Sequence, residues 1–239
     1  MNSLYYGIKA IFVKDIVTEF RSKEVLPAMI VLGMLIIWVL RLVSEVSSIS
    51  SENIGVAALW IAFLFAALLA QERSFATEQH QDCINGLLLA PVDNGAIYLA
   101  KLLANITMLC IFEIIIVPIV ILTFFKLDEF TCSPGRMIAV LLLGNIGISS
   151  IGTLFSAMVQ VSRIRGSLLS ILVLAVLLPM MIPATFALLL VFGVISEQQT
   201  NIGTLALVGN FPTALGFLIA FDAVFVTASW LLFGFVVQE

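Results

Sequence analysis

The sequence predicts an all-α, polytopic integral membrane protein with about six transmembrane helices in one domain over residues 1–239. Composition is the first observation: 62% of the 239 residues are hydrophobic and 11% are charged. A soluble domain carries about 25% charged residues. A water-soluble core of this length cannot hide so much apolar surface, so lipid must solvate most of the chain.

Six apolar runs are the second observation, and each is close to or above the ~20 residues that cross hydrocarbon as a helix. The runs lie at about 25–43, 54–70, 97–125, 137–160, 168–195 and 213–237. Pro118, Pro179 and Pro183 fall inside runs, where a kink is tolerated if neighbours satisfy the freed carbonyl. Glycine and serine are frequent in the fourth run, which predicts a central, closely packed helix. The stretch 200–212 is half apolar, which predicts an interfacial or re-entrant segment.

Residues 1–24 form a predicted helix before the first run. Apolar residues recur there at every fourth position, at Leu4, Ile8, Phe12, Ile16 and Phe20. Such a stripe beside basic residues predicts a helix at the membrane surface. Asp15 and Glu19 interrupt the apolar side, so a solvated helix leading into the bundle is the alternative. Both charge signs occur in this segment, so we expect it not to be a cleavable signal peptide.

Basic residues divide unequally between the two sides of the predicted bundle. If the N-terminus is cytoplasmic, eight of them face the cytoplasm: Lys9, Lys14, Arg21, Lys23, Arg73, Lys101, Arg163 and Arg165. Three face the other side: Arg41, Lys126 and Arg136. This excess predicts a cytoplasmic N-terminus, and an even number of spans returns the C-terminus to the same side. The expected location is the bacterial inner membrane.

Ionisable residues inside the spans are candidate functional positions. Glu113 lies near the middle of the third span, where a carboxyl group is costly unless it is paired or hydrated. It faces a cavity, a pathway or a partner helix, or it is protonated and hydrogen-bonded to Asn145 or to a serine of the fourth span. Asp222 and Arg41 lie toward the outer side of the sixth and first spans. We hypothesise that these two form a pair there.

No catalytic, cofactor or metal site is predicted. His80 is the only histidine and forms no H-E-x-x-H motif with the acidic residues around it. The three cysteines are scattered and form no C-x-x-C. An intramembrane enzyme would need a histidine partner for Glu113. No G-x-x-x-x-G-K-[ST] motif and no basic stripe occur, which argues against a nucleotide site and a nucleic-acid partner in this chain.

The loop at residues 71–96 is the longest predicted cytoplasmic segment. It begins with a charged, helix-prone stretch and continues into the leucines 87–89, Pro91 and an Asp93-Asn94-Gly95 turn. An amphipathic helix with an exposed leucine patch is typical of a segment that docks into a partner's groove. Packing of the patch against its own bundle is the alternative.

The same loop resembles a known family. The order of residues matches the cytoplasmic signature of type-2 ABC exporter permeases: Phe75, Glu78, Gly86-Leu87-Leu88-Leu89-Ala90-Pro91, Asp93 and Lys101. More closely, it is similar to the CcmB family, the haem exporter permeases of cytochrome c maturation. Further similar positions precede or lie within the first two spans: Lys14-Asp15, Glu19-x-Arg21-x-Lys23 and Leu59-Trp60. Beyond Lys101 the likeness is mainly one of hydropathy.

The resemblance implies a permease subunit rather than an enzyme. It implies two copies of a separate cytoplasmic ATPase that supply the ATP, and a homodimer of this chain. Glu78, Gly86, Leu87, Leu88 and Pro91 would shape the ATPase contact. Haem would be a possible cargo; alternatively, ATP would release a haem-loaded chaperone, with a separate membrane subunit that handles haem. Competing interpretations are an exporter of lipid, drug or glycan, and a structural membrane scaffold.

Overall fold

A computed structural model describes residues 2–79, 94–126, 132–162, 166–195 and 210–236. Over these residues the chain forms seven helices and no strand. Their bounds are α1 Asn2–Ser22, α2 Val25–Val46, α3 Ser51–Gln79, α5 Asn94–Phe124, α6 Pro134–Ser162, α7 Gly166–Val191 and α8 Phe211–Val236. All of them except α1 are long and apolar enough to cross a membrane. The predicted all-α fold with six spans is confirmed.

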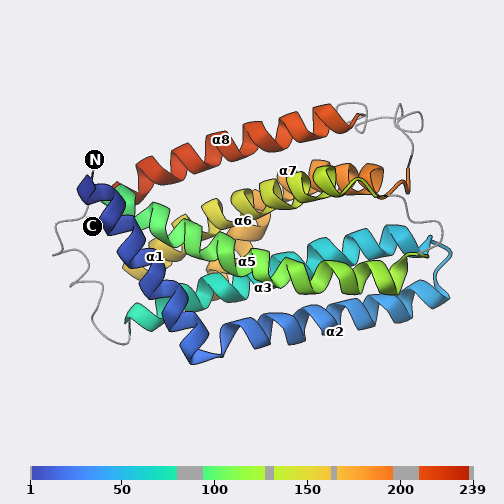
Figure 1. Cartoon of the computed structure of the whole chain (residues 1–239), viewed down its shortest axis with the longest axis horizontal. Coiled ribbons are helices and arrows are strands. Elements are labelled where there is room, and N and C mark those ends of the chain that lie inside the picture. The colour runs from blue at the N-terminus through green and yellow to red at the C-terminus, as the bar shows by residue number, and fades with distance from the viewer. Residues whose placement is uncertain (1, 80–93, 127–131, 163–165, 196–209, 237–239) are drawn as a thin grey trace.

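The six spanning helices run along one long axis, and α1 crosses one end of the bundle at a steep angle (Figure 1). The start of α1 and the end of α8 lie at this end, which we call the termini end (Figure 1). The opposite end is called the far end. Six of the eight basic residues in the predicted set lie in or beside α1, in the last part of α3 and in the first part of α5, at the termini end (Figure 1). Arg163 and Arg165 lie outside the described residues. The segment 200–212 lies almost wholly outside the described residues.

Helices α3 and α6 occupy the centre of the bundle. In each of them 67% of the most apolar window is buried, against 22% in α2 and 17% in α8. The prediction of a central fourth span is therefore confirmed, and small residues explain it. Gly144 of α6 lets the ring of Trp60 on α3 approach so closely that a Cβ at Gly144 would lie 2.6 Å from it.

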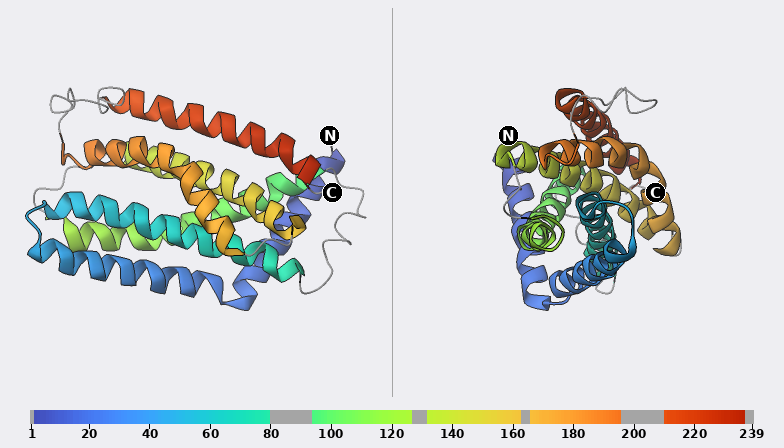
Figure 2. Two further views of the ribbon diagram at one scale, coloured as in Figure 1. Left: turned by 180° about the vertical axis from the view of Figure 1, so that it is seen from behind. Right: turned by 90° about the vertical axis from the view of Figure 1, so that its right-hand side faces the viewer.

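Prolines do not end the helices that contain them. Pro118 lies inside α5, and Pro179 and Pro183 lie inside α7. Helix α7 bends along its length (Figure 2). A proline removes one backbone hydrogen bond and displaces the preceding turn, which is the physical cause of such a bend.

Helix α1 packs against α5 through a small apolar cluster of its own. Ile11 is buried in this cluster beside Tyr98, and Ile8 packs against it. Phe20, by contrast, is exposed, as are Tyr6, Val13 and Val17. The predicted stripe therefore does not lie on a single face. A four-residue repeat exceeds the helical period of 3.6, so the stripe turns around the helix as it advances.

Candidate functional site

The predicted coupling loop joins α3 to α5 at the termini end. Its residues Gly86, Leu87, Leu88 and Pro91 lie outside the described residues, as does the side chain of Glu78 in the last part of α3. The contact residues and the coupling helix therefore stay predictions. The structure does describe the two helices that carry the loop and the helices against which they pack.

A buried ion pair ties α1 to α5 beside this loop. Lys101, in the second turn of α5, has a side chain that is only 1% exposed, and its Nζ lies 3.6 Å from Oδ2 of Asp15. Asp15 also lies 3.6 Å from Lys14 of the same helix. Asp15 and Glu19 line one small recess against α3 and α5. The acidic residues that interrupted the apolar pattern of α1 thus belong to its inner face, where Lys101 neutralises Asp15.

Polar side chains also join α3 and α5 to α6. The amide of Asn105 on α5 donates to Oγ1 of Thr153 over 2.9 Å. Gln71 on α3 donates to the carbonyl of Ile148 over 3.2 Å, and Ser156 donates to the carbonyl of Gln71 over 3.4 Å. We call this set, with Asn145 and Glu113, the polar seam. Such contacts are directional, so they define the relative register of the three helices.

A glycine makes room for the seam where α3 meets α6. A Cβ at Gly152 would overlap the side-chain amide of Gln71, which is itself 1% exposed. Because Gln71 is held by its bond to Ile148, it has little freedom to move aside. The sequence signal for this contact was a single amide residue at the end of an apolar run, together with a glycine in the fourth run. The contact between Gln71 and Gly152 was not predicted from the sequence.

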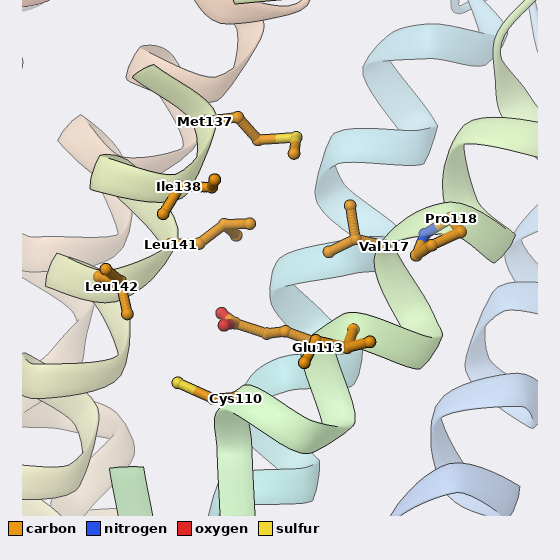
Figure 3. Close-up of a pocket in the computed structure, with 9 residues that line it drawn as sticks. Cys110, Glu113, Val117, Pro118, Met137, Ile138, Leu141 and Leu142 are labelled. Atoms are coloured by element: carbon orange, nitrogen blue, oxygen red, sulfur yellow. The ribbon is translucent and has the colours of Figure 1, made fainter. Parts of the chain in front are cut away.

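Glu113 marks the seam's end near the middle of the bundle. Asn145 of α6 donates to its Oε2 over 2.9 Å, which confirms the predicted bond across the bundle. The same carboxyl group lines a cavity between α5 and α6 (Figure 3). The two predicted alternatives, a hydrogen bond across the bundle and a cavity, therefore both describe Glu113.

The hypothesis of an Arg41–Asp222 pair is wrong. Arg41 of α2 instead lies 3.7 Å from Glu45 and donates to Ser51 over 3.2 Å. Asp222 is buried against Gly147 of α6, and neither carboxyl oxygen has a hydrogen-bond partner among the described residues. Helices α2 and α8 lie at opposite edges of the bundle (Figure 1). Opposite charges toward the same side of the membrane do not make two residues neighbours.

Two further contacts were not predicted, because the sequence carries no pattern that indicates them: the burial of Lys101 and the bond between Asn105 and Thr153. Lys101 was recognised as the start of a span, but its burial was not predicted, since lysine at a span end usually reaches the interface. Asn105 and Thr153 are ordinary polar residues until their helices are placed side by side. Over the residues that the structure describes, no three His, Cys, Asp or Glu side chains gather as a metal site would require.

The ion pair between α1 and α5 and the polar seam between α3, α5 and α6 suit mechanical coupling between these helices.

A family model for CcmB protein matches residues 7–235. This match extends from α1 to α8, well past Lys101, where the sequence resemblance had been only one of hydropathy. No curated protein matches the chain. By this match the chain belongs to the CcmB family, and it is a multi-pass membrane permease of the haem export system that serves cytochrome c maturation.

Proposed function

We propose that this chain couples ATP hydrolysis by a separate cytoplasmic ATPase to haem export or to release of a haem-loaded chaperone. The proposed complex holds two ATPase copies, two copies of this permease and a haem-handling membrane subunit in the bacterial inner membrane. The observation that supports the proposal is the pair of helices that residues 80–93 connect. These are α3 and α5, the two helices that the polar seam ties to α6.

Force on the loop would move both helices that it joins. Because Gln71 and Asn105 bond to α6, a shift of α3 or α5 is passed to the centre of the bundle. Because Asp15 pairs with Lys101, α1 moves with α5. The excess of basic residues at the termini end supports a cytoplasmic location for that end.

Affinity purification of the full-length chain from its native membrane tests the proposal. We expect an ATPase and a haem-handling membrane subunit to co-elute. Leu87→Asp should abolish ATPase co-elution and accumulation of c-type cytochromes, because a charge in the leucine patch opposes docking in an apolar groove. Ser133→Asp is the matched control, since Ser133 is exposed just before α6 at the far end, where aspartate is a good helix cap.

The wild-type result and the variant result answer separate questions. Purification without any ATPase would overturn the coupling proposal. Equal ATPase recovery with Leu87→Asp would exclude the leucine patch as the contact. If deletion of the chain leaves c-type cytochromes intact, the cargo is of another class, such as lipid, drug or glycan.

A further inference from the structure

Helix α1 lies against the side of the bundle near the termini end. Figure 2 (right) looks along the bundle and shows α1 running down one side, from the N-terminus to the start of α2. Asp15 pairs with Lys101 of α5, so the middle part of α1 meets α5 at the level of Lys101. The face of α1 that is turned away from α5, which we call its outer face, therefore points sideways out of the bundle.

Lys101 lies at the level where hydrocarbon meets headgroups. The apolar window of α5, Gly95–Phe124, is 30 residues long, whereas about 20 residues cross the hydrocarbon layer. A layer centred on this window leaves about five residues at each end, so its boundary lies close to Lys101. At the same end of the bundle, Trp230 is 45% exposed six residues before the end of α8 at Val236. Exposed tryptophan is typical of this boundary.

The outer face of α1 is apolar. Four of its large side chains are exposed: Tyr6 68%, Val13 46%, Val17 53% and Phe20 51%. Their spacings of seven, four and three residues place them on one face of a helix. This stripe lies opposite Ile11, which is buried in the cluster between α1 and α5. A continuous apolar stripe at the level of the boundary is solvated by lipid rather than by water.

Charges of opposite sign lie on different faces of α1. Its two acidic residues, Asp15 and Glu19, face inward and line the recess against α3 and α5. Its three basic residues are all exposed: Lys9, Lys14 and Arg21. Within α1, as the structure describes it, the exposed charges are therefore all positive. An apolar stripe flanked by cations is complementary to acyl chains beneath a layer of anionic headgroups.

We propose that the outer face of α1 binds anionic phospholipid in the leaflet at the termini end. Val13, Val17 and Phe20 lie among the upper parts of the acyl chains, while Lys9 and Arg21 bind the headgroups. A zwitterionic lipid offers the same acyl chains without net negative charge, so it binds this face more weakly. Because α1 is tied to α5 by its ion pair, bound lipid also holds α5 at a fixed depth. This binding requires no ATPase, so its test is independent of the proposed function.

Quenching of tryptophan fluorescence by brominated lipid tests the proposal in the full-length protein. The reporter protein carries Val17→Trp together with Trp38→Phe and Trp230→Phe, since the remaining Trp60 is only 2% exposed. It is placed in nanodiscs of phosphatidylglycerol and phosphatidylcholine in equal amounts, with bromine on one lipid or on the other. Comparison of the two quenching efficiencies gives the relative binding of the lipids beside position 17. We expect the anionic lipid to bind there about fivefold more strongly.

Trp38 provides a matched control away from α1. It is 71% exposed on α2, and a protein with Trp230→Phe alone reports on the lipid beside it. Both lipids should quench this protein equally. In the reporter protein, about 1 M salt should remove the preference and leave quenching by both lipids, because the Debye length then falls to about 3 Å. A preference of the same size at Trp38 would overturn the proposal of a site on α1.

Charge variants of the reporter protein identify the residues that recognise the headgroups. Lys9→Gln with Arg21→Gln should remove most of the preference for the anionic lipid. Lys126→Gln with Arg136→Gln removes as many exposed charges at the far end and should leave the preference unchanged. Equal quenching by the two lipids at low salt, or equal effects of the two double variants, would overturn the proposal. Absence of quenching by either lipid would also overturn it, because the outer face would then be covered by protein or by water.

Discussion

The two halves of this bundle are built from different contacts. In the termini half, helices meet through the Asp15–Lys101 ion pair and through hydrogen bonds of Gln71 and Asn105. In the far half, they meet mainly through apolar rings, besides the bond from Arg41 to Ser51 and the stacking of Arg136 on the ring of Phe211. The rings of Phe125 and Phe192 lie 5.0 Å apart at a steep angle. The ion pair there, between Arg41 and a neighbour on its own helix, is exposed and joins no two helices.

This difference between polar and apolar contacts affects how easily the helices of each half can shift relative to one another. Apolar packing is non-directional and tolerates small sliding, whereas a buried hydrogen bond or ion pair has one good geometry and is costly when half broken. The termini half therefore has discrete helix registers, and it adjoins the predicted coupling loop. The far half holds the helices together without imposing such registers.

Removing the buried cation of the termini half should have the largest effect. Lys101→Met leaves Asp15 without its interhelical partner, and we expect a loss of about 3–5 kcal/mol in the free energy of unfolding. Denaturation of the full-length protein in mixed micelles measures it. The double variant Lys101→Met with Asp15→Leu should recover most of the loss, because both charges of the buried pair are then removed together. Additive losses would contradict a direct pair.

A methyl group at the tightest point of the seam should have the next largest effect. Gly152→Ala displaces Gln71 and breaks its bond to Ile148, at a cost of about 2 kcal/mol. Gly216→Ala on α8 is the matched control, because no atom lies within 4 Å of an added Cβ there. This control should be neutral or slightly stabilising, as alanine favours a helix. Equal effects at the two glycines would remove the distinction between seam and surface.

A single seam hydrogen bond should contribute less. Asn105→Leu or Thr153→Val should each cost about 1 kcal/mol. A double-mutant cycle should give a coupling of about 0.6 kcal/mol, the average for hydrogen bonds between membrane helices. Thr107→Ala serves as the control, since its hydroxyl bonds within α5 on an exposed face. A coupling of zero would show that the two side chains do not hold α5 and α6 together.

The far-end ion pair should contribute least. The side chains of Arg41 and Glu45 are 40% and 59% exposed, so Arg41→Met should change the free energy of unfolding by at most about 0.5 kcal/mol. The measurement is the same denaturation series used for Lys101→Met. A loss near that of Lys101→Met would mean that the two halves are not electrostatically different.

Much of the fold could be predicted because lipid imposes a simple rule on sequence. Every span needs a long apolar run, so the six helices and the central fourth span were predictable from hydropathy and small residues. The Glu113–Asn145 bond was predictable as well, since consecutive spans are neighbours in most bundles and a buried carboxyl needs a partner. These predictions depend on local composition and on chain order.

Contacts between helices distant in sequence followed no such rule. Arg41 and Asp222 have opposite charges and lie in the outer parts of their predicted spans, yet their helices lie on opposite edges of the bundle (Figure 1). The inner face of α1 was hidden because Asp15 looked like a break in an apolar stripe rather than a partner for Lys101.

By itself, the sequence determined that the chain crosses the membrane about six times, which side carries more basic residues, and that no nucleotide motif is present. Only the tertiary structure decided which polar residues meet, that Lys101 is buried against Asp15, and that a cavity opens beside Glu113. The physical reason is that hydropathy measures each segment against the lipid, one segment at a time. The arrangement of helices around the bundle depends on side-chain packing between segments, which no single segment encodes.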